Sequence, residues 1–280
     1  MGGRLQLSLP FFAQDTSGTT PLYQKKFPWS NVPSRADTGD GPRGTQQGYN
    51  KCNSTTQNQY LLCQTMFLNS IQEFCLWGVF QPNSIVENIE GEMVAYCTTK
   101  KFGTRLIPSG AITGVQLTRT LGYIQVVGFI NPTVPNLQEV HPLTLNGVFC
   151  YKACNPAGPN APQLCQHIYD QIWLCIQCSS NYPSINGTYQ SCQGENLLPA
   201  GTYIENGVTK TYQLPPESLG TITSIPHTAS IPSVSNCFTY KDPAALWHNF
   251  PKTQTVANTS STVNRKGVSS STSDGSKQKA

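Results

Sequence analysis

The stretch that decides the fold runs from Arg105 to Ile130 and reads RLIPSGAITGVQLTRTLGYIQVVGFI. It is rich in β-branched and apolar residues, which favour strands. Two clusters of turn-forming residues, Pro108-Ser109-Gly110 and Thr120-Leu121-Gly122, divide it. The sequence therefore predicts strands over 105–108, 111–117 and 123–130, the last of them buried in the middle of a sheet.

Further strands follow along the chain. Residues 148–153 have the composition of a short strand. Residues 202–204 and 208–214 flank Glu205-Asn206-Gly207, which is a strong signal for a hairpin turn. Four prolines punctuate residues 215–236, so we expect this part of the chain to be extended and to lie at an edge rather than in the middle of a sheet.

Two segments have the periodicity of amphipathic helices. Apolar residues recur mostly three or four positions apart between Tyr60 and Trp77, and again between Pro162 and Leu174. Proline at the start of the second segment suits the first turn of a helix. We therefore expect helices over 60–77 and 162–174.

All eleven cysteines lie between Cys52 and Cys237, which is the pattern of one cross-linked domain with uncrosslinked ends. Only Cys175-Ile-Gln-Cys178 has the spacing of half a zinc site or of a dithiol redox motif, so structural disulfides are the preferred interpretation. Because the count is odd, at least one thiol is left over or pairs outside the chain, and either Cys175 or Cys178 is our candidate for it. We assign five disulfides to Cys52, Cys63, Cys75, Cys97, Cys150, Cys154, Cys165, Cys175, Cys192 and Cys237.

The composition agrees with an extracellular protein. Charged residues make up only 11% of the chain, and glycine and proline number 23 and 21; intracellular domains carry roughly twice that charged share. N-glycosylation sequons begin at Asn53, Asn186 and Asn258. No apolar run is long enough for a membrane span. Met1–Gln14 makes a poor secretion signal, and we expect the true signal to be missing from this chain.

The fold class that follows is β-rich (α+β), with a single disulfide-stabilised β domain, two or three short helices and disordered ends. We expect an irregular leader over 1–44, the disulfide-rich domain over 45–240 and a disordered tail over 241–280. The last 29 residues contain 12 serines and threonines and almost nothing apolar, so they cannot bury enough surface to become ordered.

The charge argues against a nucleic-acid partner. The formal net charge is +4, and residues 252–280 supply all of it. The rest of the chain holds 13 basic and 13 acidic residues, so it creates no field that would attract nucleic acid.

Carboxylates are the candidate catalytic groups. Glycoside hydrolysis needs two of them a fixed distance apart. Glu90-Gly91-Glu92 would place two acids on one side of an extended strand, although a solvated strand edge explains them equally well. His167 and Asp170 would share a helix, although packing of His167 beside Cys165 is the preferred interpretation. The catalytic candidates are Glu73, Glu90, Glu92 and Asp170.

The sequence shows no motif for a cofactor or a metal. It contains no GxSxG elbow, P-loop or dinucleotide fingerprint, so we expect no cofactor and no metal. An aromatic group could stack on sugars or form part of the core; it comprises Trp77, Phe80, Trp173, Tyr182 and Tyr189.

Many short motifs occur in a fixed order: Asn50–Thr56 (NKCNSTT), Cys63–Asn69 (CQTMFLN), Phe74–Trp77 (FCLW), Gly103–Gly110 (GTRLIPSG), Tyr123–Ile130 (YIQVVGFI), Phe149–Cys154 (FCYKAC), Cys165–Asp170 (CQHIYD) and Pro215–Gly220 (PPESLG). Over residues 28–240 the chain resembles the macrophage-activating glycoproteins of basidiomycete fungi. The resemblance implies an extracellular glycoprotein, often with a Ser/Thr-rich C-terminus and named for an effect on host immune cells. The family has no agreed enzymatic activity, so no catalytic residue can be transferred.

The chain departs from the family pattern in three places. Only 18 residues separate Ile130 from Phe149, where the family has a longer stretch that contains Gly, Asp and His. The segment Trp173–Ser180 is altered and supplies the extra cysteine. A convincing secretion signal is missing.

The function we expect is that of a secreted fungal glycoprotein that acts without catalysis, by recognition at the cell wall or at a host interface. Its partner would be a cell-wall polysaccharide or a host surface receptor. A secreted carbohydrate-active enzyme that uses paired carboxylates is the alternative. A cytosolic thiol or metal protein is a third hypothesis, and it requires free cysteines and unoccupied sequons.

Overall fold

The structure is a computed structural model, and it describes residues 27–34, 40–41, 44–45, 48–55, 57–81, 84, 89–131, 147–166, 168–169, 177–216, 222, 225 and 229–241. Several expectations lie outside these residues. They are the leader before residue 27, the tail after residue 241 and the proposed roles of His167, Asp170, Trp173, Cys175 and Asn258.

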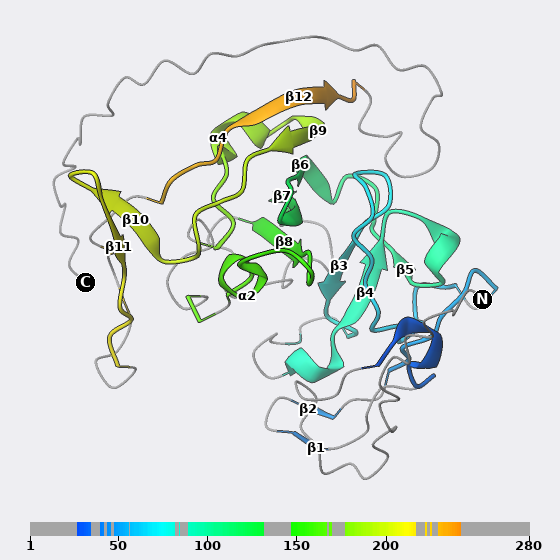
Figure 1. The fold of residues 1–280 in the computed structure, drawn as a ribbon. Coiled ribbons are helices and arrows are strands. Elements are labelled where there is room, and N and C mark those ends of the chain that lie inside the picture. Colours follow the sequence, from blue (N-terminus) through cyan, green and yellow to red (C-terminus); the bar gives the residue numbers. More distant parts are fainter. Residues whose placement is uncertain are drawn as a thin grey trace, which may run out of the picture.

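The larger sheet has five strands in the order β12-β9-β6-β7-β8 (Figure 1). Strands β6 and β9 are parallel, and the other neighbours are antiparallel. The strands expected over 111–117, 123–130 and 148–153 are confirmed, and β12 is an edge strand, as the preceding prolines predict. The strands are β6 (Ile112–Arg119), β7 (Tyr123–Ile130), β8 (Val148–Cys154), β9 (Tyr189–Gly194) and β12 (Val234–Thr239).

The smaller sheet has three strands in the order β3-β4-β5. Strand β3 (Cys75–Gly78) runs antiparallel to β4 (Val94–Cys97), and β5 (Arg105–Leu106) runs parallel to β4. The strand expected over 105–108 is therefore present, but only two of its residues pair.

The main core lies between these two sheets, which stand next to each other in Figure 1. Alternate residues of each strand point into it because side chains alternate across a strand. Phe74 directly precedes β3, and its ring stacks on the ring of Phe149 of β8, with the ring centroids 6.3 Å apart. The Tyr151 hydroxyl accepts a hydrogen bond from the Trp77 backbone N–H at 3.1 Å, which ties β8 to β3. The buried residues of this main core are Ile71, Phe74, Leu76, Val94, Tyr96, Ile107, Ala111, Ile112, Val115, Leu117, Val126, Ile130, Phe149 and Tyr189.

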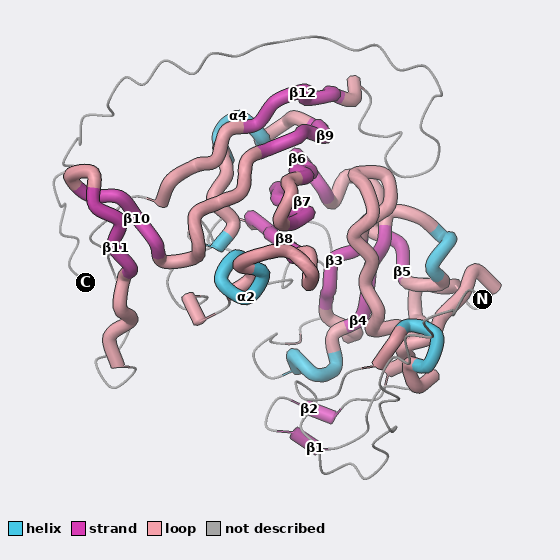
Figure 2. Tube along the Cα trace, viewed as in Figure 1, coloured by secondary structure: helices cyan, strands magenta, loops and turns pink. Residues whose placement is uncertain are grey.

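The hairpin predicted around Asn206-Gly207 is confirmed. Strands β10 (Thr202–Glu205) and β11 (Val208–Thr211) pair antiparallel and project from the body (Figure 2). Asn206 and Gly207 have φ values of 52° and 76°, as a two-residue hairpin turn requires. A further short ladder joins β1 (Asp40–Gly41) to β2 (Gly44–Thr45).

The helix predicted over 60–77 is wrong. Residues 57–74 form turns and extended chain, and Leu68 pairs with Phe74 in an isolated antiparallel bridge. Between them the Ser70 hydroxyl accepts hydrogen bonds from the backbone N–H groups of Gln72 and Glu73. Such local side-chain hydrogen bonds compete with those of a helix, and the apolar spacing reflects a chain that folds back on itself.

The second expected helix is only one turn long. Helix α2 covers Ala161–Leu164, and Cys165 then bonds to Cys154 at the end of β8. The covalent link turns the chain away from the helix axis, so the prediction of a helix over 162–174 is wrong for residues 165, 166, 168 and 169. The other helical turns described are α4 (Tyr182–Ile185), η2 (Trp29–Asn31), η3 (Glu90–Glu92) and η4 (Lys100–Phe102).

The fold class predicted from the sequence is confirmed: a β-rich domain with a few short helices and five disulfides. The disulfides are Cys52–Cys63, Cys75–Cys97, Cys150–Cys178, Cys154–Cys165 and Cys192–Cys237. Within the described residues, no helix has the length and apolar character that a membrane crossing needs.

Candidate recognition surface around the Cys52–Cys63 disulfide

A segment that we call the strap, residues 48–55 and 57–68, covers the outer face of the three-stranded sheet. The backbone N–H groups of Cys75 and Ala95 donate to the carbonyl oxygens of Phe67 and Cys63, at 2.9 and 2.6 Å. The Trp77 indole N–H donates to the carbonyl oxygen of Gln64 at 3.0 Å. These bonds tie the strap to β3 and β4, and the Cys75–Cys97 disulfide lies beneath it.

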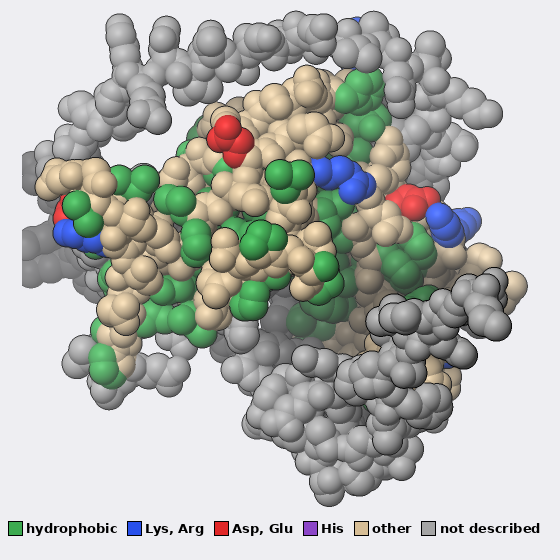
Figure 3. Space-filling view, in the orientation of Figure 1, with side chains coloured by type: hydrophobic (Ala, Val, Ile, Leu, Met, Phe, Trp, Pro, Cys, Tyr) green, Lys and Arg blue, Asp and Glu red, His purple; other side chains and the backbone are tan. Residues whose placement is uncertain are grey.

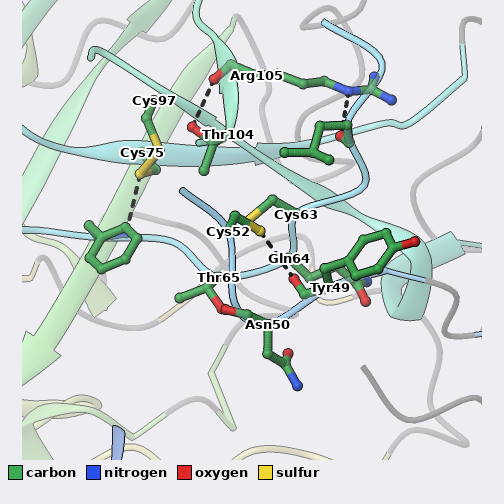
Figure 4. Close-up of a disulfide and its surroundings, with 12 residues drawn as sticks. Tyr49, Asn50, Cys52, Cys63, Gln64, Thr65, Cys75, Cys97, Thr104 and Arg105 are labelled. Carbon is green, nitrogen blue, oxygen red and sulfur yellow. Dashed lines mark hydrogen bonds between the residues drawn. A yellow bond between two sulfur atoms is a disulfide. The ribbon is translucent and has the colours of Figure 1, made fainter. Parts of the chain in front are cut away.

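The strap is closed on itself by the Cys52–Cys63 disulfide (Figure 4). Tyr49 exchanges backbone hydrogen bonds with Leu62 and Gln64, at 2.7 and 2.8 Å. The Thr65 hydroxyl donates to the carbonyl oxygen of Asn50 at 2.6 Å. Both ends of the loop 52–63 are therefore held side by side.

Arg105 fastens the strap to the sheet. Its side chain extends from β5 toward the strap in Figure 4, and the residue is only 5% exposed. The guanidinium donates to the carbonyl oxygens of Leu61 and Phe80, at 3.1 and 3.0 Å, and to the Tyr96 hydroxyl at 2.8 Å. One side chain thus joins the strap, the end of β3 and β4.

The chain from Phe102 to Leu106 runs under the outer part of the strap. The Phe102 ring stacks on Phe67 at 3.9 Å, and Trp29 meets the Phe67 ring edge to face at 5.8 Å. Gly103 lies against the backbone of Asn53, so closely that a Cβ on Gly103 would come within 2.0 Å of the Asn53 carbonyl oxygen.

The next contact along this run is made by Gln59. Its side-chain amide exchanges two hydrogen bonds with the backbone of Leu106, at 2.7 and 3.2 Å. The neighbouring Tyr60 is 87% exposed, and Trp29 is 58% exposed. We call the exposed residues Trp29, Asn53 and Tyr60 the aromatic ledge. Asn53 lies directly on Gly103, whereas Trp29 reaches Phe102 through Phe67, and Tyr60 follows the Gln59 that bonds to Leu106.

The two sequons within the described residues, at Asn53 and Asn186, lie on exposed loops. The Asn53 carboxamide oxygen accepts hydrogen bonds from the backbone N–H of Thr55, at 3.0 Å, and from the Thr55 hydroxyl. Asn186 follows α4 in a turn that the Thr188 N–H closes on the Ile185 carbonyl oxygen at 2.9 Å. Both asparagines are exposed.

The structure describes three of the four carboxylates proposed for catalysis. Glu73 forms an ion pair with Lys101 at 3.1 Å on the surface. Glu90 and Glu92 lie in the helical turn η3 and not on an extended strand, so the prediction that they share one side of a strand is wrong. A contact with the strap explains this difference. The Gln64 side chain donates to the carbonyl oxygens of Gly91 and Met93 and holds this turn ahead of β4. Asp170 lies outside the described residues.

The Cys175/Cys178 motif does not form a local pair. Cys178 bonds to Cys150 of β8, which is 28 residues away. Because the ten cysteines other than Cys175 all pair among themselves, the structure does not support assigning Cys175 to a disulfide within the chain. Among the described residues, no group of three His, Cys, Asp or Glu side chains could hold a metal ion.

The described members of the aromatic group singled out from the sequence pack on other side chains of the domain. Tyr189 is buried, Phe80 packs on the main core, and Tyr182 meets Phe129 edge to face at 6.3 Å. Trp77 meets Tyr151 in the same way at 5.7 Å. The exposed aromatic side chains are Trp29, Tyr49 and Tyr60 instead. Sequence reasoning missed the strap surface because it placed Tyr60 on the apolar face of a helix.

Lys152 is a second feature that the sequence did not reveal. It lies on the face of β8 that points away from the main core, directly opposite Gln125 of β7. Its ammonium donates to the carbonyl oxygen of Gln177 and lies 4.8 Å from the centre of the Tyr123 ring. Burial lowers the pKa of Lys152 to about 8, because the charged form loses its hydration.

The comparisons with known proteins point to fungi. No protein-family model and no solved structure matches the chain. The chain is 31% identical over 211 residues to the appressorium protein ROW1 of the basidiomycete Mycosarcoma maydis, with 61% of this chain and 49% of the relative covered. It is 28% identical over 227 residues to the appressorium protein ROW2 of the same fungus, with 66% and 74% covered.

The chain thus spans about half the length of ROW1 and about three quarters of ROW2. Neither relative carries the macrophage-activating name that the sequence motifs suggested. What the comparisons support is similarity to fungal appressorium proteins of a basidiomycete.

Proposed function

We propose that the protein is a secreted fungal surface glycoprotein that acts by recognition and not by catalysis. The observation that carries this proposal is the similarity to two appressorium proteins over about 210–230 residues, in a domain that five disulfides cross-link. Disulfides of this density persist in oxidising surroundings, which favours the outside of the cell.

The surface chemistry supports recognition, because charged side chains are few on the face drawn in Figure 3. The strap presents exposed aromatic rings and amide side chains around the Asn53 sequon, and such groups bind uncharged partners through stacking and hydrogen bonds. Catalysis has weaker support, because the Glu73 carboxylate is ion-paired with Lys101 and Glu92 lies in a tight helical turn. The partner would be a cell-wall polysaccharide or a receptor on the host surface, and the macrophage-activating resemblance fits the same extracellular setting.

The test begins in the native fungus. Tagged protein is localised by microscopy, and protein from the wall and the culture filtrate is analysed by non-reducing mass spectrometry. We expect wall or filtrate localisation, ten blocked cysteines and glycan on Asn53 or Asn186. Cytosolic protein with free thiols and bare asparagines would contradict the proposal.

A second experiment separates recognition from catalysis. Purified protein is incubated with wall glucan, chitin and mannan, and both retention and released sugars are measured. Retention without released sugar is expected. Sugar release that Glu92→Gln abolishes would replace recognition by the hydrolase alternative.

A further inference from the structure

We propose that Asn206 is a site of spontaneous deamidation, and that its isoaspartyl product opens the hairpin of β10 and β11. The dipeptide Asn-Gly favours this chemistry, because glycine has no side chain to hinder the attack of its own backbone nitrogen on the preceding carboxamide. The chain contains three such dipeptides, which begin at Asn146, Asn186 and Asn206. Asn146 lies outside the described residues, so the structure compares the other two. The inference does not depend on the proposed function.

The reaction needs only this chain and water. The backbone nitrogen of Gly207 attacks Cγ of the Asn206 carboxamide and gives up its proton, ammonia leaves, and a succinimide ring forms. Water then opens the ring at either of its two carbonyl groups. One opening gives aspartate, and the other gives isoaspartate, in which the backbone continues through the former side chain. Each product has a carboxylate in place of a neutral amide, and no atom is oxidised or reduced.

The tip of the hairpin leaves both reacting groups open to solvent. Asn206 and Gly207 are exposed, and a Cβ added to Gly207 would have no heavy atom within 4 Å. Among the described residues, no backbone hydrogen bond uses the Gly207 N–H as its donor. The nitrogen that attacks is therefore not tied to any other described segment.

The hairpin is also built so that it opens separately from the rest of the fold. Within the described residues, β10 and β11 form a sheet of their own, and all of β11 is exposed. Ile204 and Val208 are 62% and 57% exposed, so the hairpin buries little apolar surface. Hairpins without a packed face are marginally stable in water, and weakly packed segments open far more often than a whole domain unfolds. Such openings free the Asn206 carboxamide to reach the Gly207 nitrogen.

The same dipeptide at Asn186 is held differently. Asn186 and Gly187 are exposed too, so exposure does not separate the two sites. The Gly187 N–H, however, donates to the carbonyl oxygen of Thr113 in β6 at 3.1 Å. A Cβ on Gly114 would come within 2.9 Å of the Gly187 nitrogen and 3.1 Å of the Asn186 Cα, so this turn packs directly against β6. The attacking nitrogen is thus bonded, and we expect Asn186 to deamidate more slowly.

The two products at Asn206 differ in their effect on the hairpin. Asp-Gly suits a two-residue turn as Asn-Gly does, so the aspartyl form keeps Glu205 paired with Val208. Isoaspartate adds one backbone atom between these partners, and the turn requires two ordinary residues with positive φ. The isoaspartyl form therefore loses the register of β10 and β11.

The experiment follows both asparagines in one protein. Thr188→Ala removes the Asn186 sequon and leaves the Asn186-Gly187 dipeptide, so no glycan blocks the comparison. The full chain with this substitution is incubated in mildly alkaline buffer, and peptide mapping by mass spectrometry measures the conversion of amide to carboxyl at each site. A second sample is kept reduced in guanidinium chloride. Asn206→Gln in the same background is the matched control, because glutamine would have to form a larger and less favourable ring.

We expect Asn206 to convert about five- to tenfold faster than Asn186 in the folded protein, which is the factor that one hydrogen bond provides. In the denatured sample the two rates should agree within about twofold, because the bond to Thr113 is lost. Equal rates in the folded protein, or faster conversion of Asn186, would overturn the inference. A ratio that persists in denaturant would assign it to the flanking residues and would overturn the inference as well.

Amide hydrogen exchange tests the opening of the hairpin. Aged protein, in which enzymatic methylation identifies isoaspartate, is compared with Asn206→Asp, which contains aspartate alone. The isoaspartyl and aspartyl peptides that cover residues 202–211 are separated by chromatography after exchange. We expect faster exchange in the isoaspartyl peptide only, with β6 and β7 unchanged. Slow exchange in that peptide would overturn the opening, and equally fast exchange in Asn206→Asp would assign it to the added charge and overturn the role of isoaspartate.

Discussion

Arg105 shows how one side chain can organise a surface. It is buried, and within the described part of the chain its hydrogen bonds go to two carbonyl oxygens and a phenol. The planar guanidinium offers several donors at fixed angles, which lets it serve three segments at once. A lysine has one nitrogen, so it could reach only part of this set.

We therefore predict that Arg105→Lys lowers the free energy of unfolding by about 2–4 kcal/mol, because buried acceptors lose their donors. The measurement is denaturant unfolding followed by tryptophan fluorescence. Arg119→Lys is the control, since Arg119 is exposed and its one hydrogen bond to a described residue goes to the Asn69 carbonyl oxygen. A loss no larger than that of the control would show that Arg105 does not fasten the strap.

Lys152 gives a prediction with a defined pH window. Its pKa is lowered to about 8 in the fold and returns to its ordinary value on unfolding. Between these values the unfolded chain binds a proton that the folded chain does not, so stability rises with pH there and falls as the pH drops. We expect the wild type to gain about 1–2 kcal/mol between pH 7.5 and 9.5 relative to Lys152→Met.

The comparison requires unfolding curves at both pH values with the free thiol blocked. Lys152→Met should be the more stable protein at pH 7.5, with the difference shrinking at pH 9.5. Burial raises the pKa of Tyr151 to about 12, so its titration lies above this window. Parallel pH profiles for the two proteins would show that Lys152 is hydrated in the fold.

At the scale of elements, the junction between η4 and β5 depends on the glycine at position 103. Gly103 has φ 67°, and a Cβ there would meet the Asn53 backbone at 2.0 Å. Gly110 has φ 76° but no heavy atom within 4 Å of its Cβ position. The two glycines share a left-handed conformation and differ in the space around them.

Gly103→Ala is therefore predicted to cost at least about 2 kcal/mol more than Gly110→Ala, whose cost of about 1–2 kcal/mol is that of the left-handed conformation alone. Both are measured as shifts of the denaturant midpoint. Similar costs for the two variants would mean that the strap can move away from Gly103, and the ledge would then lack a rigid base.

The strands were predictable because their signals are local. Tyr123–Ile130 is apolar and β-branched, with turn residues before it, and it forms β7 over the predicted range. Asn206-Gly207 likewise fixes the hairpin between β10 and β11. In both cases the nearest neighbours in sequence suffice to set the backbone.

The strap was not predictable because its conformation depends on distant partners. Cys63 and Cys75 recur with other apolar residues at helical spacing, but Cys63 bonds to Cys52 at the start of the strap and Cys75 bonds to Cys97 of β4. The pairing of cysteines cannot be deduced from one sequence. Tyr60 lies inside the loop that Cys52–Cys63 closes, so its exposure could not be predicted before that pairing was known.

For the whole molecule, the disulfide pattern predicts one free thiol. Ten of the eleven cysteines are paired, which leaves Cys175 without a partner in its own chain. Alkylation of the denatured, unreduced monomer should label one cysteine, and peptide mapping should identify it as Cys175. Label at Cys178 would contradict the Cys150–Cys178 pairing, and no label would show that Cys175 is blocked or bonded to another molecule.

The positions of the described acidic side chains predict that the folded protein remains stable in mild acid. Acid unfolds proteins mainly by protonating carboxylates that are buried or paired in the native state. Among the residues whose side chains are described, none of the buried ones is Asp, Glu or His, and Glu73 forms its ion pair at the surface.

A partly exposed pair of this kind contributes about 1 kcal/mol or less. We therefore expect stability to change by no more than about 1 kcal/mol from pH 7 to pH 4, a shift in Tm of roughly 2–4 °C. Calorimetry at both pH values is the measurement, with Glu73→Gln as the control that removes the surface pair. A much larger loss of Tm at pH 4 would mean that a carboxylate outside the described residues is held in the fold, and Asp170 and Glu90 would be the first to replace by their amides.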